Sequence, residues 1–535
     1  MIACAKQSIL LLLTALCHFQ VQNYFIERLR RSRFVPIQIR EILYFVPMYD
    51  GRKEIFMKIK LNREQVMDKI YACWLGKNIG GTMGAPYEGK QEMQDINGFA
   101  TKKGEPLPND DLDLQLIWLT AMEETGPHAL SANVLADYWL MYIPPHWNEY
   151  GVGKNNAQHG IIPPMSGEFC NEEWKHSNGA WIRSEVWACM TPGFPNIAVK
   201  YALMDACVDH GISEGTYAEM FTASLESLAF FESDIRTLVE NALTYIPKNC
   251  RVARSVNLVL SEYDKKTPWR EVRELIVKDN EDLGWFQAPA NVAYTVLGLI
   301  YGEGDFKKSM IYAIDCGDDT DCTGATCGAI LGITQGTKGI PEDWREYIGD
   351  RIISLAVDRG SIWNLPNSCT EMTERVAQMI PSVLKANGVY MEFTDGETEY
   401  NKEEALAILK DVSDDFIHRC PNSFEIRNLH VQAVLECPDG ITVRANEDFK
   451  FRIVFKNLKY RPKHLQLSAF LPEGWTADYS RMVYLSHVTP NTDGRTVAEF
   501  VVHVGEKVEA MNRIYIHADS VNYTAPLTLP LVVVG

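Results

Sequence analysis

The sequence predicts a multidomain protein in which a large all-α domain is followed by a small all-β sandwich domain. Three observations support this fold class. Apolar residues recur every three or four positions between residues 62 and 387, and strand-like alternation is scarce there. From residue 425 onward, short runs alternate apolar with polar residues between turn signals such as Pro-Asp-Gly.

The 535 residues are enough for two to four domains at roughly 100–200 residues per domain. Composition changes near residue 388, where the helical period ends. We therefore expect an N-terminal extension over residues 1–61, an all-α catalytic domain over 62–387, a linker over 388–424 and a β-sandwich domain over 425–535.

The N-terminal extension contains an apolar run from Ile9 to Leu16 after a single lysine, Lys6. It resembles the short core of an export signal but lacks a clear cleavage site, and it is shorter than the about 20 residues that span a bilayer. Three interpretations stay open: an export signal, a weak membrane anchor, or a true start at Met57. The first two predict an exported or membrane-associated protein, the third a cytoplasmic one, and none predicts a stable membrane span.

Charge and cysteine usage exclude some classes of protein. A net charge of −18 argues against a nucleic-acid partner, because phosphate binding needs clustered lysine and arginine. The thirteen cysteines form no Cys-x-x-Cys pair, which argues against a zinc site or a disulfide scaffold. We expect reduced and mostly buried thiols.

Four aspartates crowd the start of an apolar segment, Asp315 to Gly336. Gly324, Gly328 and Gly332 recur every fourth residue, so they share one helical face and predict a closely packed backbone or ligand. Asp319 and Asp321 fall in the first turn, where the helix dipole contributes only about 0.3–1 kcal/mol per site. That is too little for several buried carboxylates, whereas a hard cation such as Mg²⁺ or Ca²⁺ would suffice. A solvated acidic cap is the alternative.

A second acidic cluster precedes another helix. Asn109, Asp110 and Asp111 come directly before an apolar-periodic run, and Asp113 follows. Alone, this pattern is typical of an N-cap with acidic first-turn residues. Two helices headed by carboxylates in one domain predict instead that both ends converge on a shared metal pair.

Two further stretches carry polar or flexible residues. Gly76–Lys90 is interpreted as a glycine-rich loop after a helix, ending near Glu88 and lacking the Gly-Lys-Ser/Thr of a phosphate-binding loop. Segments 144–156 and 161–169, rich in Pro, Gly and Asn, are also predicted to be loops. His176–Trp187 offers small residues whose backbone N–H groups could meet a phosphate or sugar. Its Arg183 would pair either with a ligand carboxylate or with a structural partner.

Taken in order, these stretches resemble the ADP-ribosylglycohydrolase family. The resemblance covers roughly residues 62–385 and is carried by GGTMGAPYE, NDDL, SNGAWIR, the histidine of VDHG, and GDDTDC followed by GATCGAILG. It implies an all-α fold with two Mg²⁺ ions at the mouth of a cleft, and cleavage of an N- or O-glycosidic bond at the anomeric carbon of ADP-ribose.

The resemblance also implies roles for individual residues. The implied metal ligands are Asn109, Asp110, Asp111, Asp319, Asp321 and Cys322. The implied catalytic carboxylates are Glu88, Asp110, Asp111 and Asp319, with Glu88 also on the metal side. The implied substrate-binding residues are Ser177, Asn178, Gly179, Arg183 and His210. The implied partner is a small-molecule or protein-linked ADP-ribose or sugar; no oligomeric state is predicted.

Three positions depart from the family pattern. Gly81 replaces an aspartate, Asn109 replaces a threonine, and Cys322 replaces the last threonine of the final motif. A thiol is a soft ligand that suits Mg²⁺ poorly. Whether a second ion binds is therefore open, and two alternatives remain: a hydrolase of another glycoside, such as a glycan or nucleoside, or a non-catalytic ADP-ribose or sugar-binding protein.

Overall fold

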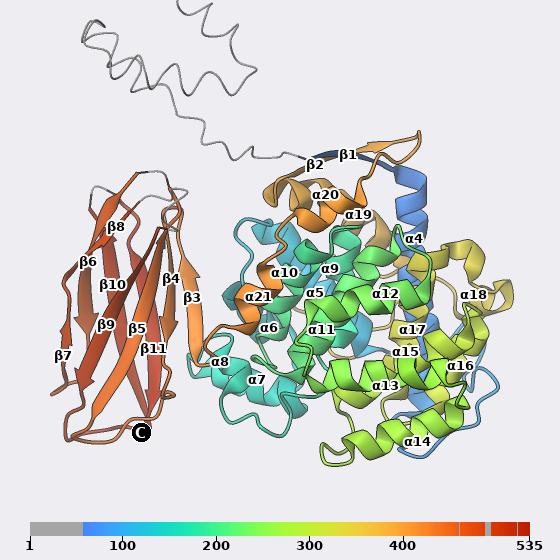
Figure 1. Ribbon diagram of the computed structural model, residues 1–535, viewed down its shortest axis with the longest axis horizontal. Coiled ribbons are helices and arrows are strands. Elements are labelled where there is room, and N and C mark those ends of the chain that lie inside the picture. Colours follow the sequence, from blue (N-terminus) through green and yellow to red (C-terminus); the bar gives the residue numbers. More distant parts are fainter. Residues whose placement is uncertain (1–56, 460, 487–493, 522) are drawn as a thin grey trace, which may run out of the picture. The chain divides into compact units, whose positions relative to one another are not determined.

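The computed structural model describes residues 57–459, 461–486, 494–521 and 523–535 (Figure 1). Helices account for most of the chain up to Ala386, and antiparallel strands for most of it after Ser423. The predicted fold class, an all-α core followed by a small β domain, is confirmed. The export-signal, anchor and alternative-start interpretations concern residues 1–56, which lie outside the described part.

The helical region consists of many short helices and a few long ones (Figure 1). In chain order they are α4 (Arg63–Gly84), α5 (Asp110–Thr125), α6 (Ala132–Tyr142), α7 (Asn148–Gln158), α8 (Met165–Glu168), α9 (Glu185–Met190), α10 (Pro195–Ala206), α11 (Glu214–Ala229), α12 (Ile235–Ala242), α13 (Arg251–Asp264), α14 (Trp269–Asn280), α15 (Ala288–Gly302), α16 (Phe306–Asp315), α17 (Thr320–Gln335), α18 (Glu342–Ile348) and α19 (Cys369–Ala386). Short 3₁₀ turns follow α4, α12 and α17, and another, Trp181–Arg183, precedes α9.

Helices α4 and α17 pack antiparallel with their backbones in close contact. A Cβ atom added at Gly80 would collide with the carbonyl group of Gly324, and one added at Gly76 would collide with that of Gly328. Further along α4, a Cβ atom added at Gly84 would collide with the carbonyl group of Thr320. The predicted glycine face of α17 is therefore confirmed as a backbone contact. Its consequence is that the C-terminal end of α4 lies beside the N-terminal end of α17.

All three segments predicted as loops contain helical residues, and residues 165–168 of the third form α8. Residues 76–84 belong to α4, because their glycines make the contact with α17 that only glycine permits. Residues 148–156 belong to α7, where a Cβ at Gly153 would come within 2.9 Å of Asp209. Glycine in these helices serves close packing rather than chain flexibility.

The segment predicted as a linker contains regular structure. Strand β1 (Met57–Asn62) pairs with β2 (Val389–Thr394) in a two-stranded sheet, and α20 (Lys402–Ala407) and α21 (Val412–Ile417) follow. Lys60 and Glu399 exchange backbone hydrogen bonds of 3.2 and 2.7 Å. Residues that precede the helical region in sequence are thus hydrogen-bonded to residues that follow it.

The C-terminal domain is made of two antiparallel sheets that enclose one apolar core. The five-stranded sheet has the order β3 (Ser423–Arg427), β4 (Val431–Glu436), β5 (Asp448–Asn457), β9 (Arg495–His503), β7 (Thr476–Tyr479). The four-stranded sheet has the order β11 (Leu527–Val534), β10 (Met511–Ser520), β6 (Lys463–Phe470), β8 (Met482–Leu485). Alternation along β5 and β10 buries every second residue, as a sandwich requires.

Two residues from the helical region belong to the sandwich core. Ile161 and Met165 are buried in the same apolar cluster as Phe424, Leu531 and the other inward-facing strand residues. Pro164 forms an isolated antiparallel bridge with Phe424. The connection between α7 and α8 therefore supplies part of the hydrophobic core of the β domain.

Candidate metal centre

The antiparallel contact of α4 with α17 places carboxylates from distant parts of the chain together. Glu88 follows the 3₁₀ turn (Ala85–Tyr87) at the end of α4, and Asp319 and Asp321 stand at the start of α17. Carboxylate oxygens of these three residues all lie within 4.8 Å of one another. This spacing is compatible with one cation bound between them.

The start of α5 joins the same cluster. Ligand atoms of Asp111, Asp321 and Cys322 also lie within 4.8 Å of one another, and all three residues are buried. Two acidic helix starts that are about two hundred residues apart in sequence are thus adjacent in space. The predicted convergence of the α5 and α17 N-termini is what the structure has, whereas the individual catalytic and ligand roles stay predictions.

The pKa values of the clustered carboxyls are raised. The negative charge of Asp321, followed by burial, raises the pKa of Glu88 to about 8. Burial, followed by the charge of Asp321, raises the pKa of Asp110 to about 7. Burial also raises the pKa of Asp111 and Asp319 well above the usual range. These directions have one cause: too many negative charges share a poorly solvated space, which a divalent cation would relieve.

Several oxygens in this cluster have no hydrogen-bond donor. Asp319 Oδ1 and Asp321 Oδ1 are buried and unpartnered among the described residues. Buried polar atoms are normally hydrogen-bonded, so orphaned carboxylate oxygens indicate a missing ligand. An all-oxygen donor set is what Mg²⁺ and Ca²⁺ prefer, and the residues therefore fit a hard divalent cation.

Asn109 serves as the N-cap of α5. Its Oδ1 accepts a 2.9 Å hydrogen bond from the backbone N–H of Asp111, while its Nδ2 is buried without a partner. A Cβ atom added at Gly81 would collide with this amide. The Asn109 side chain therefore fills the space that a side chain at position 81 would need. The amide oxygen is already used in the cap, which competes with the metal-ligand role predicted for Asn109.

Cys322 points its thiol at the acidic cluster. Its Sγ–H donates to Asp111 Oδ1 at 3.3 Å, and burial together with nearby carboxylates raises the pKa of the thiol. The neighbouring oxygen-bearing side chains of Asp318 and Thr323 are engaged elsewhere. Asp318 Oδ1 accepts from the backbone N–H of Phe286 at 2.8 Å, and the Thr323 hydroxyl donates to the Thr320 carbonyl at 3.2 Å.

The segment around Ser177 reaches the cluster through Asn178. Its Nδ2 donates to Asp319 Oδ2 at 2.7 Å, and its Oδ1 accepts from Trp181 Nε1 at 2.9 Å. The backbone N–H of Gly179 donates to Glu149 Oε1 at 3.1 Å. The structure thus brings this predicted segment to the site, although Asn178 and Ser177 are both buried.

Arg183 and His210 lie behind this segment. The Arg183 guanidinium is fully buried and binds Asp205 at 2.7 Å and Asp209 at 2.7 Å. Burial acts to raise the pKa of Asp209, but the charges of Arg183 and His210 lower it to about 2. His210 Nε2 lies 3.3 Å from Ser177 Oγ and its Nδ1 2.9 Å from Asp209. Arg183 therefore forms the structural ion pair that the sequence left open, and the substrate-binding roles of both residues stay predictions.

Sequence reasoning missed a buried counter-charge behind the carboxylate cluster. Lys77 on α4 has no exposed surface; its Nζ lies 2.7 Å from Glu185 Oε1 and 3.8 Å from Asp111 Oδ2. Gln115 Nε2 donates to Glu185 Oε2 at 2.8 Å. The only signal for Lys77 in the sequence was its place between the apolar residues Leu75 and Ile79, in a segment predicted to be a loop. Tyr150 was also missed, because its segment was predicted to be a loop; its hydroxyl donates to Asp110 Oδ2 at 3.3 Å.

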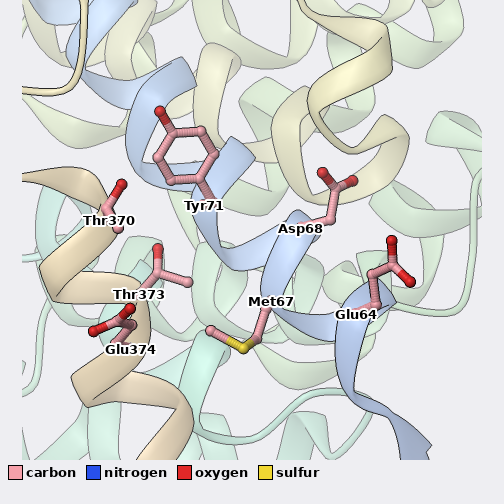
Figure 2. Close-up of a pocket in the computed structure, with 7 residues that line it drawn as sticks. All are labelled: Glu64, Met67, Asp68, Tyr71, Thr370, Thr373 and Glu374. Atoms are coloured by element: carbon pink, nitrogen blue, oxygen red, sulfur yellow. The ribbon is translucent and has the colours of Figure 1, made fainter. Parts of the chain in front are cut away.

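A surface pocket of about 430 Å³ lies elsewhere, between α4 and α19. Figure 2 shows Met67 and Tyr71 of α4 on the side of Thr373 and Glu374 of α19, whereas the carboxylates of Glu64 and Asp68 point away from α19. These residues belong to the N-terminal half of α4, whereas the carboxylate cluster lies at its C-terminal end. None of the site residues predicted from sequence lines this pocket.

Two further observations concern the cysteines and the membrane-spanning potential of the described residues. Every cysteine in the described part is free, and most are buried, as predicted. No helix within the described residues is long and apolar enough to cross a membrane.

Comparison with known proteins identifies the helical region. A family model described as ADP-ribosylglycohydrolase matches residues 62–375, more than half of the chain. A solved structure titled "ADP-ribosylglycohydrolase-related protein complex" is similar with 19% identity and a TM-score of 0.41, covering 60% of this chain and 99% of that one. No curated protein matches the sequence.

Two shorter solved structures are also similar. The GAE domain of GGA2p from Saccharomyces cerevisiae has 12% identity and a TM-score of 0.16, covering 21% of this chain and 96% of its own. The structure titled "Crystal structure of yeast GGA1_GAE domain-P21" has 11% identity and a TM-score of 0.14, covering 20% of this chain and 95% of its own. The family match contains both acidic helix starts and Asn178, and the chain therefore belongs to the ADP-ribosylglycohydrolase family of hydrolases.

Proposed function

We propose that this protein hydrolyses the glycosidic bond at the anomeric carbon of an ADP-ribosyl or related ribosyl group, and that it does so with Mg²⁺ bound at the carboxylate cluster. The single observation that carries the proposal is the meeting of Glu88, Asp319 and Asp321. Family membership supports a glycoside-cleaving hydrolase, and the unpartnered oxygens of Asp319 and Asp321 support a hard divalent cation.

Asp319 and Asp321 would hold the ion, with Glu88 at the exposed edge of the same group. When bound, Mg²⁺ supplies positive charge that orients the ribose hydroxyls and a nearby water. Asn178 and Trp181 hold Asp319 in place through the hydrogen bonds described above. These residues are fixed by buried contacts, so the site needs little rearrangement to accept a cation.

Glu88 is the carboxylate best placed to act as a base. It is exposed at the edge of the cluster, whereas Asp111 and Asp319 are fully buried. Glu88 would accept a proton from a water molecule as the water oxygen bonds to the anomeric carbon. The bond from that carbon to the leaving nitrogen or oxygen breaks, and the leaving group takes up a proton. The positive charge that develops on the sugar is stabilised by the surrounding carboxylates.

The experiment that tests this function uses the purified full chain and a panel of ADP-ribosylated peptides. We expect free ADP-ribose, detected by mass spectrometry, only when Mg²⁺ is supplied. Asp319→Ala and Asp321→Ala should each remove turnover and Mg²⁺ binding together. Asp315→Asn is the matched control: it belongs to the same acidic stretch, but its Oδ1 accepts the backbone N–H of Ile96 outside the cluster.

Different outcomes distinguish the alternatives. Full turnover by Asp319→Ala over the wild-type range of Mg²⁺ concentration would refute the site assignment. Release of a sugar from a glycan or nucleoside, with none from ADP-ribosylated peptides, would identify a different glycoside substrate. Tight ADP-ribose binding without turnover on any substrate would indicate a binding protein.

A further inference from the structure

We propose that Cys322 makes the second cation position of the cluster, which it shares with Asp111 and Asp321, select a thiophilic divalent ion such as Zn²⁺ or Co²⁺ in preference to Mg²⁺. This inference deepens the proposed function, on which it rests for the location of the site. It assigns the all-oxygen half of the cluster to a hard ion and the half that contains Cys322 to a softer ion. The all-oxygen half contains Glu88 and Asp319, and Asp321 is shared by both halves.

The geometry of the three residues fits a single ion. Their ligand atoms lie within 4.8 Å of one another. Zinc-type ions bind carboxylate oxygen at about 2.0–2.2 Å and thiolate sulfur at about 2.3 Å, so an oxygen and a sulfur bound to one ion lie at most about 4.5 Å apart. Cys322 Sγ lies 3.3 Å from Asp111 Oδ1, inside this limit.

Unsatisfied atoms provide an independent indication of a ligand. Asp321 Oδ1 and Asp111 Oδ2 are buried and have no hydrogen-bond donor among the described residues. Lys77 Nζ approaches Asp111 Oδ2 only to 3.8 Å, because it is held at 2.7 Å by Glu185. Lys77 therefore donates no hydrogen bond to Asp111 Oδ2, and this oxygen stays available as a ligand for an ion.

The thiol decides which ion is favoured. Sulfur is a soft ligand, and carboxylate–thiolate sets suit zinc-like ions much better than Mg²⁺. The Cys322 Sγ–H now donates to Asp111 Oδ1. Because metals bind the thiolate, the ion would take the place of this hydrogen, and one proton would be released to solvent. Two carboxylates and a thiolate leave a fourth position open, as in catalytic rather than structural zinc sites.

A spectroscopic experiment on the full chain tests the proposal without measuring turnover. The metal-free protein is titrated with Co²⁺, whose bond to a thiolate gives a charge-transfer absorption in the near ultraviolet. We expect this band in the wild type and in Cys327→Ser, which changes another buried cysteine of the same helix outside the cluster. We expect no band in Cys322→Ser, and a Zn²⁺ affinity that is about tenfold or more weaker.

Calorimetric titration completes the test. Mg²⁺ affinity should change by less than about threefold in Cys322→Ser, because that ion would bind the all-oxygen half. Stoichiometric Co²⁺ binding to the wild type without a thiolate band would overturn the inference, whatever the variants do. So would an unchanged band in a folded Cys322→Ser. Mg²⁺-dependent turnover without a cobalt–thiolate band would leave the proposed function standing and remove only this inference, and a band without turnover would do the reverse.

Discussion

Asn178 and Asp319 are joined by a hydrogen bond of 2.7 Å, although 141 residues separate them in sequence. The Asn178 amide cannot rotate freely, because Trp181 Nε1 occupies its carbonyl oxygen. The NH₂ group is thereby directed at Asp319. The segment between α8 and α9 thus fixes the orientation of a carboxylate that heads α17.

Asn178→Ala is expected to lower Mg²⁺ affinity and kcat/KM by about 10–100-fold, since residues that orient metal ligands have effects of this size. Calorimetric titration and steady-state kinetics measure both. Asn171→Ala is the matched control: Asn171 is an equally buried amide that donates to the carbonyls of Gly167 and Asp209. It should lower thermal stability without changing the Mg²⁺ requirement. Identical Mg²⁺ titrations for Asn178→Ala and the wild type would contradict the assigned role.

Gly80→Ala is expected to destabilise the protein by about 1–3 kcal/mol or more, because the new methyl group would collide with the backbone of α17 rather than with a movable side chain. Thermal unfolding followed by circular dichroism measures the effect. Gly396→Ala serves as the comparison, since its nearest neighbour is the Thr394 hydroxyl at 3.4 Å. That change should stay within about 0.5 kcal/mol. Equal stability of the two variants would show that α4 and α17 separate easily.

Lys77→Met should cost about 3–5 kcal/mol of unfolding free energy, because it leaves the buried Glu185 carboxylate without its cation. Urea denaturation provides the measurement. The double variant Lys77→Met, Glu185→Gln removes both charges and should recover part of the loss. Strictly additive destabilisation in this double-mutant cycle would mean that the two side chains do not interact energetically.

The β domain carries a pH-dependent contact at His503. Its Nδ1 lies 2.7 Å from Asp448 and its Nε2 3.2 Å from Asp478, and these hydrogen bonds raise the pKa of His503 above 6.5. A group whose folded pKa is raised stabilises fully below its unfolded pKa, and its contribution is lost as pH rises through the folded pKa.

The wild type should therefore be more stable than His503→Gln at about pH 6, with the difference disappearing in alkaline solution. Thermal unfolding of both proteins across this range measures the difference. Because the ring is exposed, the effect should be small and should weaken in high salt. A difference that grows with pH would have the wrong sign for this mechanism.

Local sequence patterns predicted the parts of the molecule that depend on period and capping. The change from helical period to strand alternation predicted the all-α and all-β regions. Gly324, Gly328 and Gly332 predicted a close backbone contact, and the acidic starts of α5 and α17 predicted their convergence. The first two features follow from side-chain spacing along one element, and the third from the repetition of one acidic pattern at two helix starts.

Features that depend on distant partners were not predictable in this way. The glycines of residues 76–84 suggested a loop, because nothing local shows that α17 lies against them. Lys77 was missed since its partner, Glu185, is more than a hundred residues away. Tyr150 was missed because α7 contains two glycines, and these are stable in a helix only through tight packing against neighbouring residues.

The placement of Ile161 and Met165 inside the strand core has a practical consequence for dissecting this protein. A fragment cut before Ser423 would leave both side chains facing water, and it would tend to aggregate. A fragment that begins at Ser423 would carry a hole where they belong. The enzyme is therefore best expressed as the full chain. We expect that neither the helical region nor the β domain can be transferred to a relative as an independent domain.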